Sequence, residues 1–121
     1  MIQLLVVASL FLLMGLAAFV VPRSFLHFFD LRAETATARN EIQAVYGGFG
    51  VAMAAVLAAA VQLPELRAGI AFTVAAALAG MAGGRLVAAL RERPNRWAVI
   101  FFFVEAVGAA VLLSAAGPVI G

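Results

Sequence analysis

The sequence predicts an all-α integral membrane protein, a four-helix antiparallel bundle with a short interfacial helix after its first helix. Of its 121 residues, 66% are hydrophobic and 12% are charged, and the mean hydropathy is +1.13. Soluble domains are about 45–50% apolar and about 25% charged. A soluble fold of this length cannot bury so much apolar surface, so we expect lipid to solvate the remainder. The length allows one domain, 1–121.

Four segments are long and apolar enough to span a bilayer. A spanning helix needs about 20 mostly apolar residues, and the sequence offers 2–21, 42–63, 68–90 and 97–116. Pro22 and Pro64 follow the first two segments, as expected at helix ends. The first segment lacks the basic start of a signal peptide, and its apolar run is long, so we interpret it as a retained helix.

The linkers predict how the helices are connected. Short turns join the second helix to the third and the third to the fourth, which indicates antiparallel hairpins. The linker after the first helix is longer. Its aromatic first part, 24–31, favours a short helix at the membrane interface. Its polar second part, 32–40, fits either a loop or an early start of the second helix.

The arginines predict the orientation. One side of the predicted bundle carries six arginines and the other only Arg67; the six are Arg23, Arg32, Arg39, Arg91, Arg93 and Arg96. Short arginine-rich loops remain cytoplasmic, so we expect a multi-pass membrane protein with this side in the cytoplasm and both termini outside. The basic residues form no run with interleaved aromatics, which argues against a nucleic-acid partner.

Small residues predict where the helices touch, because they let backbones approach in lipid. Gly48 begins such a stripe on the second helix, and Gly80 and Gly84 form a G-x-x-x-G motif on the third. The simpler interpretation is packing within one bundle. The alternative is a face for a homodimer or a membrane-protein partner built on Gly80 and Gly84. The sequence leaves both open.

Two ionisable residues lie well inside predicted helices. Arg85 precedes the turn between the third and fourth helices by about 9 Å of helix, and Glu105 follows it by about 12 Å. Each alone costs about 2.5–3.5 kcal/mol in a bilayer, so we predict a buried salt bridge, direct or bridged by water. It serves either to fix the register of the two helices or to form a cytoplasm-facing polar pocket with Glu105 as acid, base or proton carrier.

Polar residues at the start of the second helix extend this candidate site. On helical phasing Glu41 shares a face with Gly48, which predicts that it points toward Arg85, with Tyr46 one turn deeper. Asn40 is alternatively expected as an N-cap and Glu41 as a charge at the positive helix end. The candidate catalytic residues are Glu105, Arg85 and Glu41, and the candidate ligand-binding residues are Arg39, Asn40, Glu41, Tyr46, Arg85 and Glu105.

Metal chemistry has little support in this sequence. There is no cysteine, His27 is the only histidine, and the carboxylates are scattered. We expect no metal and no cofactor.

Three short motifs resemble one known family. They are Asn40-x-x-x-Ala44-x-Tyr46-Gly47-Gly48, Gly84-Arg85 and Glu105. They resemble the bacterial family of small four-helix membrane proteins named domain of unknown function 4345, over nearly the whole chain. One departure is Gln43, where the family pattern has a basic residue. The resemblance implies the fold, the location of the site and residence in the bacterial inner (cytoplasmic) membrane, but no activity.

Three functions fit these observations. The first is a protein that binds a lipophilic or lipid ligand, or a membrane partner, at the polar pocket. The second is a membrane enzyme performing proton transfer on a lipophilic substrate, with Glu105 or Glu41 moving the proton and Arg85 steadying negative charge. The third is a small dimeric transporter, which needs a carboxylate exposed to its translocation path. A close arginine partner for Glu105 disfavours the second and third functions.

Overall fold

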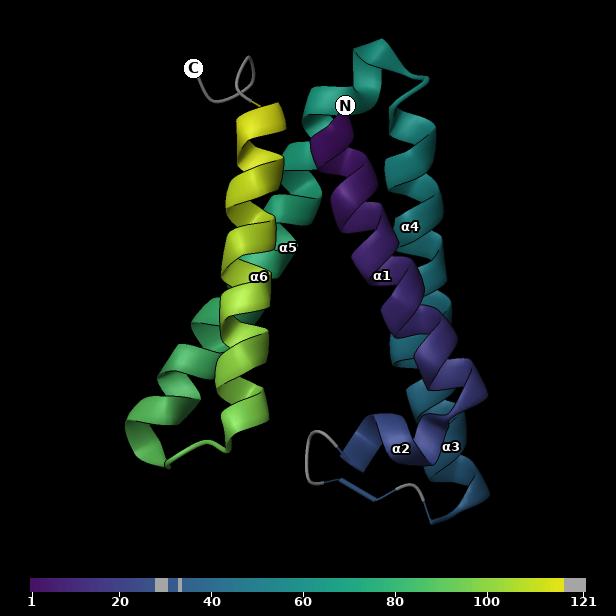
Figure 1. Cartoon of the computed structure of the whole chain (residues 1–121), viewed down its shortest axis with the longest axis vertical. Helices are drawn as coiled ribbons and strands as arrows, with labels where there is room; N and C mark the ends of the chain where they lie inside the picture. The colour runs from purple at the N-terminus through teal and green to yellow at the C-terminus, as the bar shows by residue number, and fades with distance from the viewer. Residues whose placement is uncertain (28–30, 33, 117–121) are drawn as a thin grey trace.

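Helices make up all the regular structure in the described part of the chain. The computed structural model describes residues 1–27, 31, 32 and 34–116. The helices are α1 (Ile2–Val20), α2 (Pro22–His27), α3 (Ala36–Ile42), η1 (Gln43–Gly48), α4 (Phe49–Ala60), α5 (Pro64–Arg91) and α6 (Arg96–Ala115) (Figure 1). Within these residues, four spans, one of them the continuous Ala36–Ala60, are long and apolar enough to cross a membrane. The prediction of an all-α chain with four such helices is confirmed.

The helix ends correct two details of the prediction. The second span begins at Ala36, where the Thr35 hydroxyl accepts a hydrogen bond from the Ala38 N–H at 3.0 Å. Asn40 therefore lies inside α3, and its predicted N-cap role is wrong. Pro64 is the first residue of α5 rather than the end of the preceding helix, a position that suits proline because the first helical N–H has no partner in the helix.

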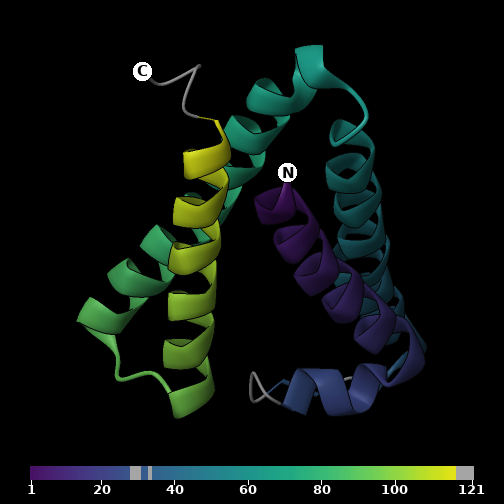
Figure 2. The same ribbon diagram turned by 45° about the horizontal axis from the view of Figure 1, so that its top comes forward.

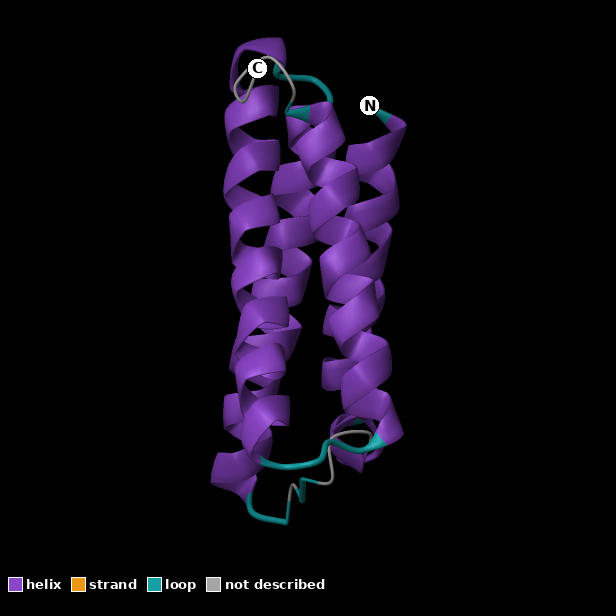
Figure 3. Cartoon of the chain, turned by 90° about the vertical axis from the view of Figure 1, so that its left-hand side faces the viewer, coloured by secondary structure: helices purple, strands orange, loops and turns teal. Residues whose placement is uncertain are grey.

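The four long helices are grouped in two pairs. α1 packs along η1 and α4, and α5 packs along α6. The pairs lie close together at the end where α1 begins and α6 ends, and they diverge toward the other end (Figures 1 and 2). Viewed from the side, the long helices run alongside one another, with the connecting loops at their two ends (Figure 3).

Two apolar clusters hold this arrangement. The first joins both pairs and contains Leu4, Val7, Ala8, Phe11, Ala54, Leu57, Ala60, Val74, Ala75, Leu78, Ala109 and Leu112. The second cluster joins α1, α2 and α3, and contains Ala18, Phe25, Leu26 and Ile42. The second cluster contains no residue of α5 or α6. It therefore makes no contact between the two helix pairs at the end where they diverge.

Segment η1 is a π-helix, in which the Phe49 N–H reaches back five residues to the Ala44 carbonyl. One extra residue per turn shifts the buried face of the second span. The buried positions accordingly step by five from Ile42 to Gly47 and then by three or four through Gly50 and Ala54. The Tyr-Gly-Gly motif lies within this segment.

Short helix α2 agrees with the helix predicted after the first span. It runs across the end of α1 at a wide angle to the long helices (Figure 2), with Phe25 and Leu26 buried. Residues 28–30, the later part of the predicted interfacial helix, lie outside the described residues.

Candidate functional site

Arg85 and Glu105 form a buried, bidentate ion pair. The Arg85 Nε donates to Glu105 Oε1 at 2.7 Å, and a terminal guanidinium nitrogen donates to Oε2 at 3.1 Å. The Glu105 side chain is 7% exposed and that of Arg85 is 27% exposed. The predicted buried salt bridge is confirmed, and the contact is direct.

The close packing of α5 on α6 positions this pair. The α6 N-terminus is fixed by Asn95, whose side-chain oxygen accepts a hydrogen bond from the Ala98 N–H at 2.8 Å. Glu105 lies on the buried face of α6 with Gly108 and Ala109. The Arg85 guanidinium also lies 5.7 Å from the centre of the Phe101 ring, where cation–π attraction adds to the ion pair.

A pocket of about 310 Å³ lies between the two helix pairs beside Glu105. We call it the interpair pocket. From α1 and α2 it is lined by Val7, Leu10, Phe11, Leu13, Met14, Ala17 and Phe25, and from α5 and α6 by Leu78, Met81, Phe101, Val104, Glu105 and Gly108. Glu105 is the one charged residue among them. The wall is thus apolar except for a single carboxylate.

Arg85 does not line the interpair pocket. It lines a separate hollow of about 210 Å³ formed by the α5–α6 pair, together with Pro94, Ala98 and Phe102 among others. The two members of the ion pair therefore border different cavities. The interpair pocket is lined by Glu105 and not by Arg85.

The other predicted ligand-binding residues lie at a different place. Arg39 is half-buried, and Asn40 and Glu41 are exposed, all on α3, which packs against η1 and α2. Tyr46 is half-buried on η1, with its ring edge-to-face against Phe25 at 5.3 Å between centroids. The structure brings together Arg85 and Glu105, and it places the exposed Glu41 on the other helix pair.

The glycines predicted to pack within the bundle face outward. A Cβ built on Gly80 or Gly84 meets no atom within 4 Å, and one on Gly48 meets only the Gln43 carbonyl at 3.8 Å. The expectation of intramolecular packing at these three positions is wrong. The helices are alanine-rich on several faces, so small residues alone do not identify the buried face.

Other glycines make the close contacts. A Cβ on Gly15 would lie 2.8 Å from the Gly47 carbonyl oxygen, and one on Gly50 would lie 2.9 Å from the Phe11 carbonyl oxygen. On α6, a Cβ on Gly108 would lie 3.2 Å from Leu78. A lone glycine in the leucine-rich first helix was the available signal for the α1–α4 contact.

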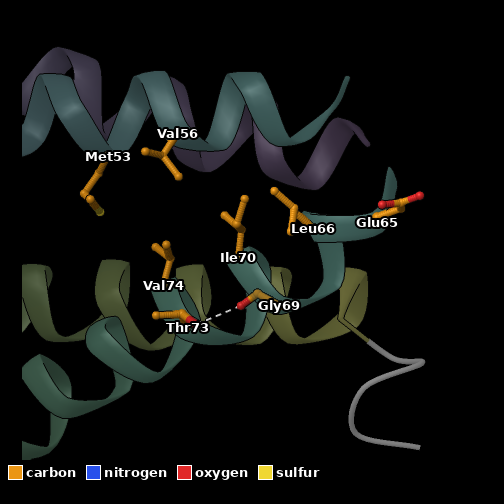
Figure 4. Close-up of a pocket in the computed structure, with 8 residues that line it drawn as sticks. All are labelled: Met53, Val56, Glu65, Leu66, Gly69, Ile70, Thr73 and Val74. Atoms are coloured by element: carbon orange, nitrogen blue, oxygen red, sulfur yellow. Dashed lines mark hydrogen bonds between the residues drawn. The ribbon is translucent and has the colours of Figure 1, made fainter. Parts of the chain in front are cut away.

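A further pocket, of about 390 Å³, lies between α4 and α5 on another face (Figure 4). Its lining is apolar apart from Glu65 and Thr73, both exposed. The Thr73 hydroxyl donates to the Gly69 carbonyl at 2.8 Å, a bond within its own helix. This pocket has no buried polar group to orient a ligand, so the interpair pocket is the better candidate.

Most of the interpair pocket could not be predicted from the sequence. Its lining residues are ordinary apolar residues of a membrane-type helix, and only the charged Glu105 stood out. Among the described residues, no group of three or more His, Asp or Glu side chains is placed to hold a metal ion. What the site offers chemically is an apolar volume with one hydrogen-bond-accepting anion at its wall.

Comparison with known proteins identifies one similarity. A family model described as "Domain of unknown function (DUF4345)" matches residues 1–116, a range that includes all four long helices and the ion pair. This is the family that the Tyr-Gly-Gly, Gly-Arg and glutamate motifs resemble. Nothing among the curated proteins and nothing among the solved structures matches the chain.

Proposed function

The chain belongs to the DUF4345 family, and we propose that it is a membrane protein that binds a lipophilic or lipid ligand in the interpair pocket. The observation that supports this most is the position of Glu105, one carboxylate in the wall of an otherwise apolar pocket of about 310 Å³. Ligand pockets are commonly about 300–1,000 Å³, mostly apolar, with a few placed polar groups.

The outer surface of the helices supports location in a membrane. Large apolar side chains are exposed on all four long spans, among them Leu13 at 68%, Leu90 at 81% and Val107 at 60%. A soluble monomer rarely exposes so much contiguous apolar surface. We propose the cytoplasmic membrane, with the six-arginine end in the cytoplasm and both termini outside.

The outward face of α5 supports a partner. Gly80 and Gly84 leave open space on this helix, and small residues spaced four apart let a second helix approach closely. We propose that a second copy of the chain packs here. Arg39, Asn40 and Glu41 lie at the arginine-rich end, where we propose contact with lipid head groups rather than with the pocket.

The two alternative functions have weaker support. Proton transfer needs a group free to gain and lose a proton, but both Glu105 oxygens accept hydrogen bonds from Arg85. The interpair pocket has no second titratable side chain in its lining. A dimeric transporter needs a carboxylate at its subunit interface, whereas Glu105 is only 5% exposed within a single chain.

Native mass spectrometry of the protein extracted with its lipids tests ligand binding. Val104 lines the pocket and Val107, one turn further along α6, does not; both side chains are substantially exposed, so both positions tolerate a larger residue. We expect a bound lipophilic molecule on the wild type and on Val107→Trp, and its loss from Val104→Trp. If both variants retain the lipophilic molecule equally, the interpair pocket is not its binding site.

A further inference from the structure

The two sides of the ion pair are not equally available to a molecule in the interpair pocket. Glu105 lines the pocket, whereas Arg85 lines the hollow formed by α5 and α6. The remaining lining residues are Val, Leu, Phe, Met, Ala and Gly. A ligand therefore meets one strong hydrogen-bonding group in this wall, and that group is an acceptor.

The carboxylate retains acceptor capacity for a ligand. Each Glu105 oxygen accepts one hydrogen bond from Arg85, and an ionised carboxylate offers about four lone-pair sites. In the described chain no other group donates to it in the hydrogen bonds found. The bidentate arginine fixes the orientation of the carboxylate, so the remaining lone pairs have a set direction.

We infer that the ligand of this pocket is a lipophilic molecule that ends in an O–H or N–H donor, an alcohol or an amine, and not a fatty acid. This inference rests on the proposed function. The hydrocarbon body fills the apolar walls, and the donor hydrogen reaches Glu105. A ligand carboxylate would place a second negative charge beside Glu105 in a site of low dielectric, where like charges repel strongly.

The test compares matched probes on the purified full-length protein. The probes are a saturated long-chain alcohol, its methyl ether, and the amine and carboxylic acid of the same chain length. Binding is measured by native mass spectrometry titration. A hydrogen bond to a charged group is worth more than a neutral one. We therefore expect the alcohol and the amine to bind at least about tenfold more tightly than the ether. The acid is expected to bind most weakly.

Variants link this ranking to Glu105. Glu105→Gln removes the negative charge and leaves Arg85 cationic, so the preference for alcohol over acid is expected to fall at least about tenfold or to invert. The matched control is Glu65→Gln, which removes an exposed carboxylate outside the interpair pocket and should leave the ranking unchanged. If Glu105→Gln does not fold, the uncharged double variant Arg85→Gln/Glu105→Gln replaces it and should lose the discrimination against the acid.

The outcomes separate this inference from the proposed function. If alcohol, ether and acid bind the wild type equally and Val104→Trp abolishes binding of all of them, the pocket stands and the inference about the head group fails. If the acid binds as tightly as the alcohol, the inference is wrong. If no probe binds and no lipophilic molecule is retained, both fail.

Discussion

Gly15 of α1 and Gly50 of α4 bring the backbones of their helices into contact. A Cβ built on Gly50 would lie 3.0 Å from the Gly15 Cα, and one on Gly15 would lie 2.9 Å from the Val51 backbone nitrogen. Backbone atoms cannot move aside as a flexible side chain can. The α1–α4 pair, which forms one wall of the interpair pocket through α1, therefore depends on glycine at this crossing.

We expect Gly15→Ala to destabilise the protein by about 1–3 kcal/mol, because the new methyl group overpacks the crossing. The measurement is thermal unfolding of the purified protein in detergent. Gly69→Ala, on α5 and outside the proposed dimer face, is the matched control. A Cβ there meets nothing within 4 Å, and alanine is favoured over glycine in a helix by about 0.8–1.0 kcal/mol, so this variant should be neutral or slightly stabilising. Equal destabilisation by both variants would contradict the assigned packing faces.

The ion pair was predictable because one turn anchors both positions. Arg85 and Glu105 were counted from the same turn, which the structure places between Arg91 and Arg96, the end of α5 and the start of α6. A small error in the predicted position of that turn shifts the expected depths of both residues together, so their relative height is little affected. The cost of an isolated charge in lipid then required a partner at the same height, and the structure shows the contact at 2.7 Å.

The packing faces were not predictable by the same means. In soluble helices the polar face identifies the outside, but here both faces of the second span are apolar and rich in small residues. Gly47 and Gly50 are buried while the adjacent Gly48 is exposed. The π-helical segment adds a shift of phase that α-helical counting does not include. The divergence of the pairs, and so the pocket, depends on contacts between distant segments that leave no local pattern.

The orientation can be tested with single cysteines, since the chain has none of its own. Gln62 and Glu92 are exposed. Gln62 lies in the turn between α4 and α5, and Glu92 lies in the turn between α5 and α6, so they mark opposite ends of α5. Because arginine-rich loops remain cytoplasmic, we expect a membrane-impermeant maleimide to label Gln62→Cys in intact cells. Glu92→Cys should react only after the cells are permeabilised. Its labelling after permeabilisation shows that this cysteine can react, which is the control for its lack of labelling in intact cells. The reverse pattern would invert the proposed topology.

The proposed dimer is tested at Gly84. If the dimer forms, photoreactive leucine incorporated into the chain should cross-link two copies of the wild type in membranes. Leucine at position 84 should block close approach of a second helix, so we expect Gly84→Leu to lose this cross-linked dimer. Gly69→Leu is the control, since Gly69 on the same helix also has nothing within 4 Å of its Cβ position and lies just over four turns away. Unchanged cross-linking in Gly84→Leu would place the contact elsewhere. Unfolding temperatures of both variants should match the wild type, which separates loss of the dimer from loss of the fold.

The last prediction concerns the energetic role of the ion pair. Removing one partner of a buried pair leaves an uncompensated charge, at a cost of about 3–5 kcal/mol, and we expect the lower end because the Arg85 side chain is 27% exposed. Glu105→Leu should therefore be strongly destabilising. Arg85→Met combined with Glu105→Leu should recover most of that loss, because apolar residues of similar size can replace a buried pair at little cost.

A double-mutant cycle of unfolding free energies measures this coupling. If the pair mainly fixes the register of α5 and α6, the double variant should be less uniquely packed but need not lose a bound alcohol. If Glu105 is the ligand acceptor, the double variant folds and yet loses the preference for the alcohol over its ether. Retention of that preference without Glu105 would leave the ion pair with a structural role alone.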